Sequence, residues 1–253
     1  MTQASLLSAA HQSHAKSSAL VRALAELLEA DVPLSHQRFI ERLGQTFDLA
    51  DSIKISAVHE QVTAVAAPPA SDDKQAVKEE YQRVRAAIER SARQSFVVTD
   101  DNARMRFPQV RAEMTLEEAM AAEPYLVFYV AQQRNMDYRI RDLHTSTRDA
   151  LTALSPKLAR LAALDAVLAE PLSTAVRRSF AAVPRLLRRR FDTLQAAYHN
   201  SNPEPTVARE RWLLTLGQLR TEMQGLLLAE MDARLLPTLG LIEAMDELDD
   251  HDD

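Results

Sequence analysis

The chain has 253 residues, of which 46% are hydrophobic, and it carries a formal net charge of −6 at pH 7. Only four residues are glycine and none is cysteine. The shortage of glycine disfavours a doubly wound sheet or a barrel, because tight turns depend on glycine. The lack of cysteine excludes disulfides, thiolate metal sites and a cysteine nucleophile. Strong helix formers such as alanine, leucine, arginine and glutamate dominate instead, and they predict an all-α protein.

Three segments make up the first part of the sequence. Residues 1–16 are small and polar, which predicts a disordered tail. Residues 17–66 place apolar side chains at helical spacing, so we expect an N-terminal helical segment. Residues 66–73, AAPPASDD, contain two adjacent prolines that forbid helix continuation, and they predict a linker. We expect the N-terminal segment to dock on the main helical bundle, residues 74–246, or to form a hairpin joined to it by the linker.

The cytoplasm is the expected compartment. The start of the sequence lacks the charged and long apolar stretches of a secretion signal. No run of 18 apolar residues is present, so we expect no helix that spans a bilayer.

The main bundle is predicted to begin with a helix over residues 73–95. Charged residues cover most of this helix, and one narrow apolar seam should face the core: Val77, Tyr81, Val84 and Ile88. Residues 96–114 predict an extended loop that could include a short strand at residues 96–98. Thr115 and Glu118 then have the spacing of a capping box, in which each side chain bonds to the other residue's backbone N–H. A short helix to about residue 122 should follow.

The longest predicted helix covers residues 124–154, with Pro124 in its first turn. A mostly apolar seam recurs along it at alternating spacings of three and four: Leu126, Tyr129, Gln133, Met136, Ile140, Leu143, Thr147, Ala150 and Leu154. Such a heptad pattern indicates packing against other long helices. The polar residues Gln133 and Thr147 within the seam weaken a dimeric coiled coil and favour an intramolecular bundle.

Two helices are predicted between residues 155 and 199. Ser155 and Pro156 form a cap and first-turn pair, and the helix that they start should end near Glu170 and Pro171. A second helix is expected over residues 172–199, with a bend at Pro184.

A further long helix should start after Thr206 and end near residue 236, where Pro237 and Gly240 interrupt it before a short terminal helix. A leucine-rich stripe along it, with Trp212, predicts either a central place in the bundle or an oligomer contact. The acidic tail, residues 247–253, is interpreted as a solubilising end, with a docking role as the alternative.

The most specific candidate for a binding site is a cluster of arginines. On a helical wheel five of them fall within about 120° of arc: Arg177, Arg178, Arg185, Arg188 and Arg189. One interpretation is a solvated helix face with no binding role, in which Asp192, one turn after Arg188, partly neutralises the charge. The alternative is an anion-binding stripe for an acidic helix of a partner, the protein's own acidic tail or nucleic acid, because arginine grips carboxylates and phosphates with two bonds.

Patterns of catalytic residues are missing from the sequence. There is no nucleophile elbow, phosphate-binding loop, zinc-protease motif or dinucleotide fingerprint. His11 and His14 could share one helix face, but no third ligand lies nearby, so we expect no metal and no cofactor. His144, beside the heptad seam, is expected to be partly buried with its hydrogen bonds satisfied.

Four sequence blocks resemble an uncharacterised proteobacterial family, the domain of unknown function three-three-four-eight. They are ERLGQTFDLADSIKIS, YLVFYVAQQRNMDYRIRDL, the block from SPKLARLAALDAVLAEPL to VPRLLRRRFDTL, and LLLAEMDARLLPTLGLIEAM. The family usually has tryptophan where this chain has Phe47. The resemblance implies no catalytic residues, and it implies genes that neighbour those of cell-envelope proteins.

Together these observations predict an elongated all-α bundle that acts as a non-enzymatic adaptor or scaffold, and the resemblance implies a place in an envelope-linked bacterial assembly. The arginine cluster would be its polar binding determinant. A nucleic-acid-associated regulator that uses the same cluster is the alternative, disfavoured because the whole chain is acidic and no aromatic side chains interleave with the arginines.

Overall fold

A computed structural model describes residues 74–97 and 105–247 of the chain. The predicted tail, N-terminal helical segment and linker, as well as the last six residues of the acidic tail, lie outside the described residues. The all-α prediction is confirmed for the described part, which contains helices and no strand: α5 (Lys74–Ser95), α6 (Leu116–Ala119), α7 (Glu123–Leu154), α8 (Pro156–Phe180), α9 (Val183–Asn200) and α10 (Ala208–Glu247).

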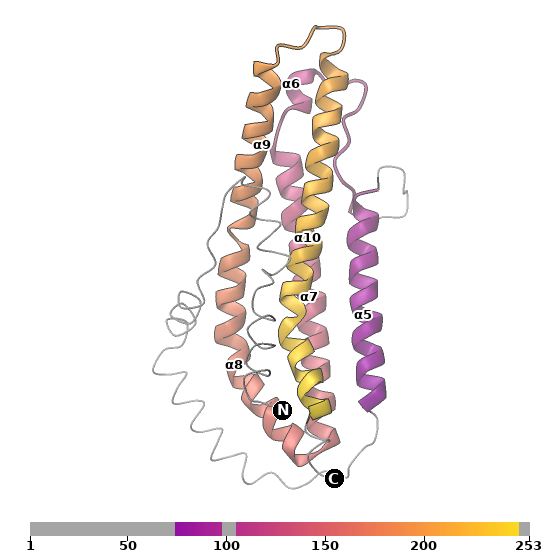
Figure 1. The fold of residues 1–253 in the computed structure, drawn as a ribbon, viewed down its shortest axis with the longest axis vertical. Coiled ribbons are helices and arrows are strands. Elements are labelled where there is room, and N and C mark those ends of the chain that lie inside the picture. The colour runs from indigo at the N-terminus through magenta and orange to yellow at the C-terminus, as the bar shows by residue number, and fades with distance from the viewer. Residues whose placement is uncertain (1–73, 98–104, 248–253) are drawn as a thin grey trace, which may run out of the picture.

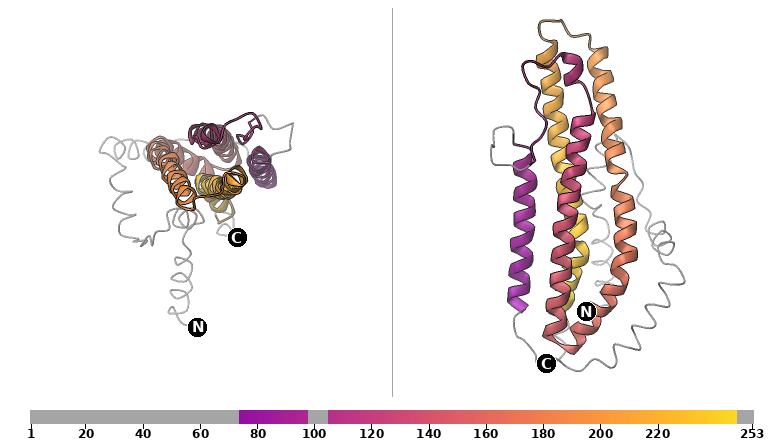
Figure 2. Two further views of the ribbon diagram at one scale, coloured as in Figure 1. Left: turned by 90° about the horizontal axis from the view of Figure 1, so that it is seen from above. Right: turned by 180° about the vertical axis from the view of Figure 1, so that it is seen from behind.

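The long helices lie roughly side by side and give the described part an elongated shape (Figure 1). Helix α9 continues the line of α8, so the two form one rod. Helices α7 and α10 occupy the middle, with α5 on one side and the α8–α9 rod on the other, as Figure 2 also shows. Both central helices contact α5, α8 and α9 as well as each other. This arrangement places α10 at the centre of the bundle.

The core follows the seams that the sequence predicts. Along α7, Leu126 and Ala150 are partly buried and pack against the core, and the other seven positions of the heptad pattern are buried: Tyr129, Gln133, Met136, Ile140, Leu143, Thr147 and Leu154. On α10, Trp212 and the leucines and methionines in register with it are also buried, whereas Leu236 is 58% exposed. The seam of α5 packs on the same core. Burial of these stripes is the main source of the bundle's stability.

Local signals at two helix starts are also confirmed. The Thr115 hydroxyl accepts a hydrogen bond from the backbone N–H of Glu118 at 3.2 Å, and the Glu118 carboxylate accepts one from the backbone N–H of Thr115 at 2.7 Å. This is the predicted capping box at the start of α6. The hydroxyl of Ser155 likewise accepts from the N–H of Leu158 at 3.2 Å, at the start of α8.

Phe96 and Val97 do not form the expected strand. Their backbone N–H groups bond back to the carbonyls of Arg93 and Gln94, at 3.2 and 3.0 Å, and so continue α5 as a turn. Phe96 is buried, and its ring meets the ring of Phe128 edge-on with centroids 5.0 Å apart. The aromatic packing decides the conformation here, because it holds the residues after α5 against α7.

The predicted helix end near Glu170 and Pro171 is wrong, since α8 continues through both residues to Phe180. A proline removes one backbone N–H, a loss that a helix packed against neighbours can absorb as a local bend. The break lies at Ala181 and Ala182 instead. Pro184 falls in the first turn of α9, where its missing N–H has no cost.

The predicted interruption at Pro237 and Gly240 is wrong as well, because α10 is one helix of 40 residues. Buried side chains continue on both sides of the proline, including Leu235 at 2% and Met245 at 0% exposure. Their burial outweighs the helix bond that proline removes, which would have joined its N–H to the carbonyl of Ala233.

Candidate functional site

The five predicted arginines are all exposed on the α8–α9 rod. Arg177 and Arg178 belong to the end of α8, and the other three belong to α9: Arg185, Arg188 and Arg189. The prediction placed them on one helix, whereas the structure divides them at Ala181 and Ala182. Since α9 continues the line of α8 (Figure 1), the arginines still follow one rod.

Most of this positive charge has no counter-charge in the described part of the chain. Arg178, Arg185 and Arg189 form no side-chain hydrogen bond or ion pair with any described residue. Arg188 does pair with Asp192, as predicted, at 3.3 Å. Both side chains of this pair are more than half exposed, at 52% and 56%, so water screens the pair and it contributes little.

The inner face of α9 is different, because its arginine has a structural role. Arg190 is 11% exposed and forms hydrogen bonds of 2.8 and 3.0 Å with the two carboxylate oxygens of Glu222 on α10. Burial alone would raise the pKa of Glu222, but hydrogen bonds from Arg190 and Gln218 and the charge of Arg190 bring that pKa below its ordinary value. This pair fastens α9 to α10 and leaves the outer arginines free to bind other molecules.

A buried polar cluster joins α7 to α10 within the core. Glu230 has 0% exposure, and its carboxylate accepts hydrogen bonds from the Tyr129 hydroxyl at 2.6 Å and from the Gln133 amide at 2.8 and 3.0 Å. Arg234 lies 3.5 Å from the same carboxylate and 2.8 Å from that of Asp137. Gln133, a polar residue in the predicted seam, therefore serves as a donor to a buried acid.

Burial raises the pKa of Glu230 above its ordinary value, although the hydrogen bonds from Tyr129 and Gln133 and the charge of Arg234 oppose that shift. Burial, together with the neighbouring Glu230 carboxylate, also raises the pKa of Tyr129 well above its ordinary value. The Arg234 guanidinium packs over the Phe180 ring, 4.1 Å from its centroid. Its side chain is 7% exposed, and its Nε atom is buried with no hydrogen-bond partner among the described residues.

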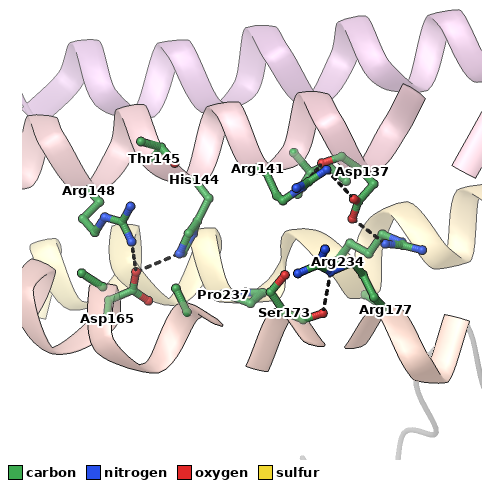
Figure 3. A pocket seen from close by; sticks show the side chains of 14 residues that line it. Asp137, Arg141, His144, Thr145, Arg148, Asp165, Ser173, Arg177, Arg234 and Pro237 are labelled. Atoms are coloured by element: carbon green, nitrogen blue, oxygen red, sulfur yellow. Dashed lines mark hydrogen bonds and ion pairs between the residues drawn. The ribbon is translucent and has the colours of Figure 1, made fainter. Parts of the chain in front are cut away.

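Arg234 also forms part of the wall of a groove between α7, α8 and α10 (Figure 3). The cavity in this groove is about 380 Å³. Its ionisable lining is mostly basic, with four arginines, one histidine and two aspartates: Arg141, Arg148, Arg177, Arg234, His144, Asp137 and Asp165. Arg177 therefore belongs to the predicted cluster and to the groove at once.

His144 is fixed between two helices at one end of the groove. Its Nε2 atom lies 2.8 Å from the Asp165 carboxylate of α8, and its Nδ1 atom lies 3.0 Å from the Thr238 hydroxyl of α10. The side chain is 16% exposed, so the predicted partly buried and satisfied imidazole is confirmed. The sequence of hydroxyl, imidazole and carboxylate resembles a nucleophile relay, but Thr238 is 1% exposed and its hydroxyl is closed to a substrate.

The groove was not predicted from the sequence, although one signal for it exists. Asp137, Arg141, His144 and Arg148 follow one another at spacings of four, three and four, and so form a polar stripe beside the apolar seam of α7. The other wall could not be found in this way, because Asp165, Arg177 and Arg234 come from helices far along the chain.

Comparison with known proteins places the chain in a family. The sequence profile of DUF3348, described as a protein of unknown function, matches residues 6–247. The chain belongs to this family. No curated protein and no solved structure matches it. The DUF3348 match covers the arginine cluster, the buried cluster and the groove, so all three lie inside the family's domain.

Two properties of the described residues of this DUF3348 protein bear on its function. No helix among them is long and apolar enough to cross a membrane. No group of three or more histidine, aspartate or glutamate side chains there is arranged to hold a metal ion. His11 and His14 lie outside the described residues.

Proposed function

We propose that this protein is a non-enzymatic helical adaptor of the bacterial cytoplasm that binds an acidic surface of a partner protein through four exposed arginines of the α8–α9 rod, Arg178, Arg185, Arg188 and Arg189. The observation that carries the proposal is the set of exposed guanidinium groups, on Arg178, Arg185 and Arg189, that meet no counter-charge among the described residues. Arginine suits this role because its planar group binds a carboxylate with two parallel hydrogen bonds.

The architecture also fits an adaptor. Arg185 and Arg189 are one helical turn apart on α9, a spacing that matches successive carboxylates on a partner helix. Their helix is held from behind by the Arg190–Glu222 pair, so the backbone that carries them needs little rearrangement on binding. Envelope-associated proteins encoded near family members are the first partners that we propose to test.

Affinity purification from the native host tests the proposal, with the proteins that co-purify quantified by mass spectrometry. The test variant is Arg185→Glu/Arg188→Glu/Arg189→Glu. The matched control is Arg90→Glu/Arg134→Glu/Arg211→Glu, which makes the same charge change at exposed arginines of α5, α7 and α10. We expect a specific protein that co-purifies with the wild type and the control and is lost with the test variant.

Nucleic acid is the competing partner, since the same guanidinium groups would bind phosphates. A salt titration of DNA and RNA binding by the purified protein separates the two functions. A binding constant whose logarithm falls steeply with the logarithm of salt concentration would favour the regulator, provided that the test variant abolishes the binding. A set of co-purifying proteins that is unchanged between the wild type and the test variant would contradict the adaptor.

A further inference from the structure

The groove between α7, α8 and α10 is lined by arginines and by short apolar side chains. We propose that it is a binding site for a small organic dianion with a short apolar body, of the class of phosphate monoesters and dicarboxylates. This ligand is distinct from the partner protein proposed above, and the groove has features of a formed site in its size, its charge and its unsatisfied donors.

The size of the groove fits such a ligand. Its cavity of about 380 Å³ falls in the range of small-molecule sites, roughly 300–1,000 Å³. Part of its wall is apolar and comes from all three helices, with Ile140 on α7, Ala166 and Ala169 on α8, and Ala233 and Pro237 on α10. These side chains would contact the apolar body of the ligand while its charged end meets the arginines.

The charge of the groove calls for a doubly charged ligand. Its four arginines exceed its two aspartates by two positive charges when His144 is neutral. The aspartates are already engaged, since Asp137 pairs with Arg141 at 2.9 Å and with Arg234 at 2.8 Å, and Asp165 pairs with Arg148 at 3.6 Å and forms a hydrogen bond of 2.8 Å with His144. Glu230, behind Arg234, offsets part of that arginine's charge, so the excess lies mainly on Arg177, which has no acid partner among the described residues.

Two donor groups of the arginines that line the groove lack an acceptor among the described residues: the terminal nitrogens of Arg177 and the Nε atom of Arg234. Among the described residues, the only hydrogen bond of the Arg177 side chain is a 3.3 Å bond from Nε to the Ser173 carbonyl of its own helix. Figure 3 shows this side chain reaching from α8 toward the middle of the groove. The Nε atom of Arg234 is buried and has no hydrogen-bond partner among the described residues, and the whole side chain is only 7% exposed. An anion held by Arg177 and Arg141 would use the first group.

Isothermal titration calorimetry on the full chain tests the site, with phenyl phosphate and phenylsuccinate as probes at physiological salt. Phenol and inorganic phosphate are the controls, since phenol offers only the apolar body of the ligand and inorganic phosphate offers only its charged end. We expect at least one probe to bind saturably, with one molecule per chain. Phenol and inorganic phosphate should each bind at least about tenfold more weakly than that probe. No saturable binding of either probe, or equal binding of phenol, would overturn the proposal.

Variants separate the groove from general positive charge. Arg177→Gln should weaken probe binding by about tenfold, because it removes the one groove arginine that has no acid partner among the described residues. Ala166→Glu, at an exposed position of the groove wall, should abolish binding by placing a carboxylate among the arginines. Arg189→Gln is the matched control on α9 and should leave binding unchanged. Equal losses in Arg177→Gln and Arg189→Gln would contradict a defined site.

The same variants keep this proposal separate from the adaptor function. Arg177→Gln should weaken probe binding and leave partner capture by Arg185, Arg188 and Arg189 in place. The glutamate variant of those three residues should lose the partner and still bind the probes. Probe binding that disappears only with the α9 variant would refute the groove as the site.

Discussion

Replacing Arg234 by methionine tests the buried cluster that joins α7 to α10. The change leaves the fully buried Glu230 without its cation, whereas Asp137 keeps its pair with the half-exposed Arg141 at 2.9 Å. Removing one partner of a buried ion pair costs about 3–5 kcal/mol. Methionine restores apolar packing over Phe180, so we expect a loss near the lower end, about 3 kcal/mol.

A second substitution should recover part of that loss. Glu230→Gln in the Arg234→Met background makes the buried group neutral, so it no longer needs a cation. Its amide can accept a bond from Gln133 and donate one to the hydroxyl of Tyr129. We expect the double variant to lose about 1–2 kcal/mol relative to the wild type, less than Arg234→Met alone.

The cost of Arg234→Met should also depend on pH. Because burial holds the pKa of Glu230 above its unfolded value of about 4.5, the folded state keeps a proton that the unfolded state releases. Stability from this group is therefore fully present below the unfolded pKa and is lost as pH rises through the folded pKa. Losing the Arg234 charge raises the folded pKa further, so the loss continues to higher pH and the cost should grow from pH 4.5 upward.

Urea unfolding followed by tryptophan fluorescence measures these effects. Trp212, the single tryptophan of the chain, is 1% exposed and packs against the rings of Phe191 and Tyr198, so its emission reports on the bundle itself. The slope of the transition should stay constant across the variants. A cost of Arg234→Met below about 1 kcal/mol would contradict the role given to Arg234, and so would a double variant that loses the sum of the two single changes.

Four more substitutions test the fold by the same assay. Leu151→Ala, at 0% exposure on α7, should cost about 2–5 kcal/mol, whereas Leu214→Ala, at 71% exposure on α10, should change stability by less than about 0.5 kcal/mol; equal effects would contradict the core described above. Pro237→Ala should stabilise the protein by about 1–3 kcal/mol, since it restores a helix hydrogen bond within α10, and a lower midpoint would mean that the ring is needed there. Thr115→Ala should cost about 1 kcal/mol by removing the cap of α6, and an unchanged midpoint would show that the capping box is dispensable.

The parts of the fold that were predicted correctly are those set by local spacing. The heptad pattern of α7 identified its buried face, including the polar members Gln133 and Thr147, because helix geometry fixes which side chains share a face. The capping box before α6 was also predicted, since both of its hydrogen bonds join residues three positions apart. These features need no knowledge of the rest of the chain.

The errors arose where tertiary packing overrides a local preference. Pro171 and Pro237 were expected to end helices, yet both lie inside helices that are held by neighbours on either side of the proline. The groove has the same origin, because Asp137, Asp165 and Arg234 meet only through the arrangement of three helices. A sequence pattern indicates the face of one helix, and it does not say which other helix that face will meet.

Site-specific photo-crosslinking in the native host tests the proposed adaptor surface most directly. A photoreactive amino acid would replace Arg185 or Arg189 on α9 in turn, with the exposed Leu214 of α10 as the control position. We predict that both α9 positions form an adduct with one and the same acidic protein. The adduct should be absent when the two remaining arginines of the set Arg185, Arg188 and Arg189 are changed to glutamate. Adducts from Leu214 alone, or adducts that a nuclease destroys, would contradict the claim that these arginines bind a partner protein.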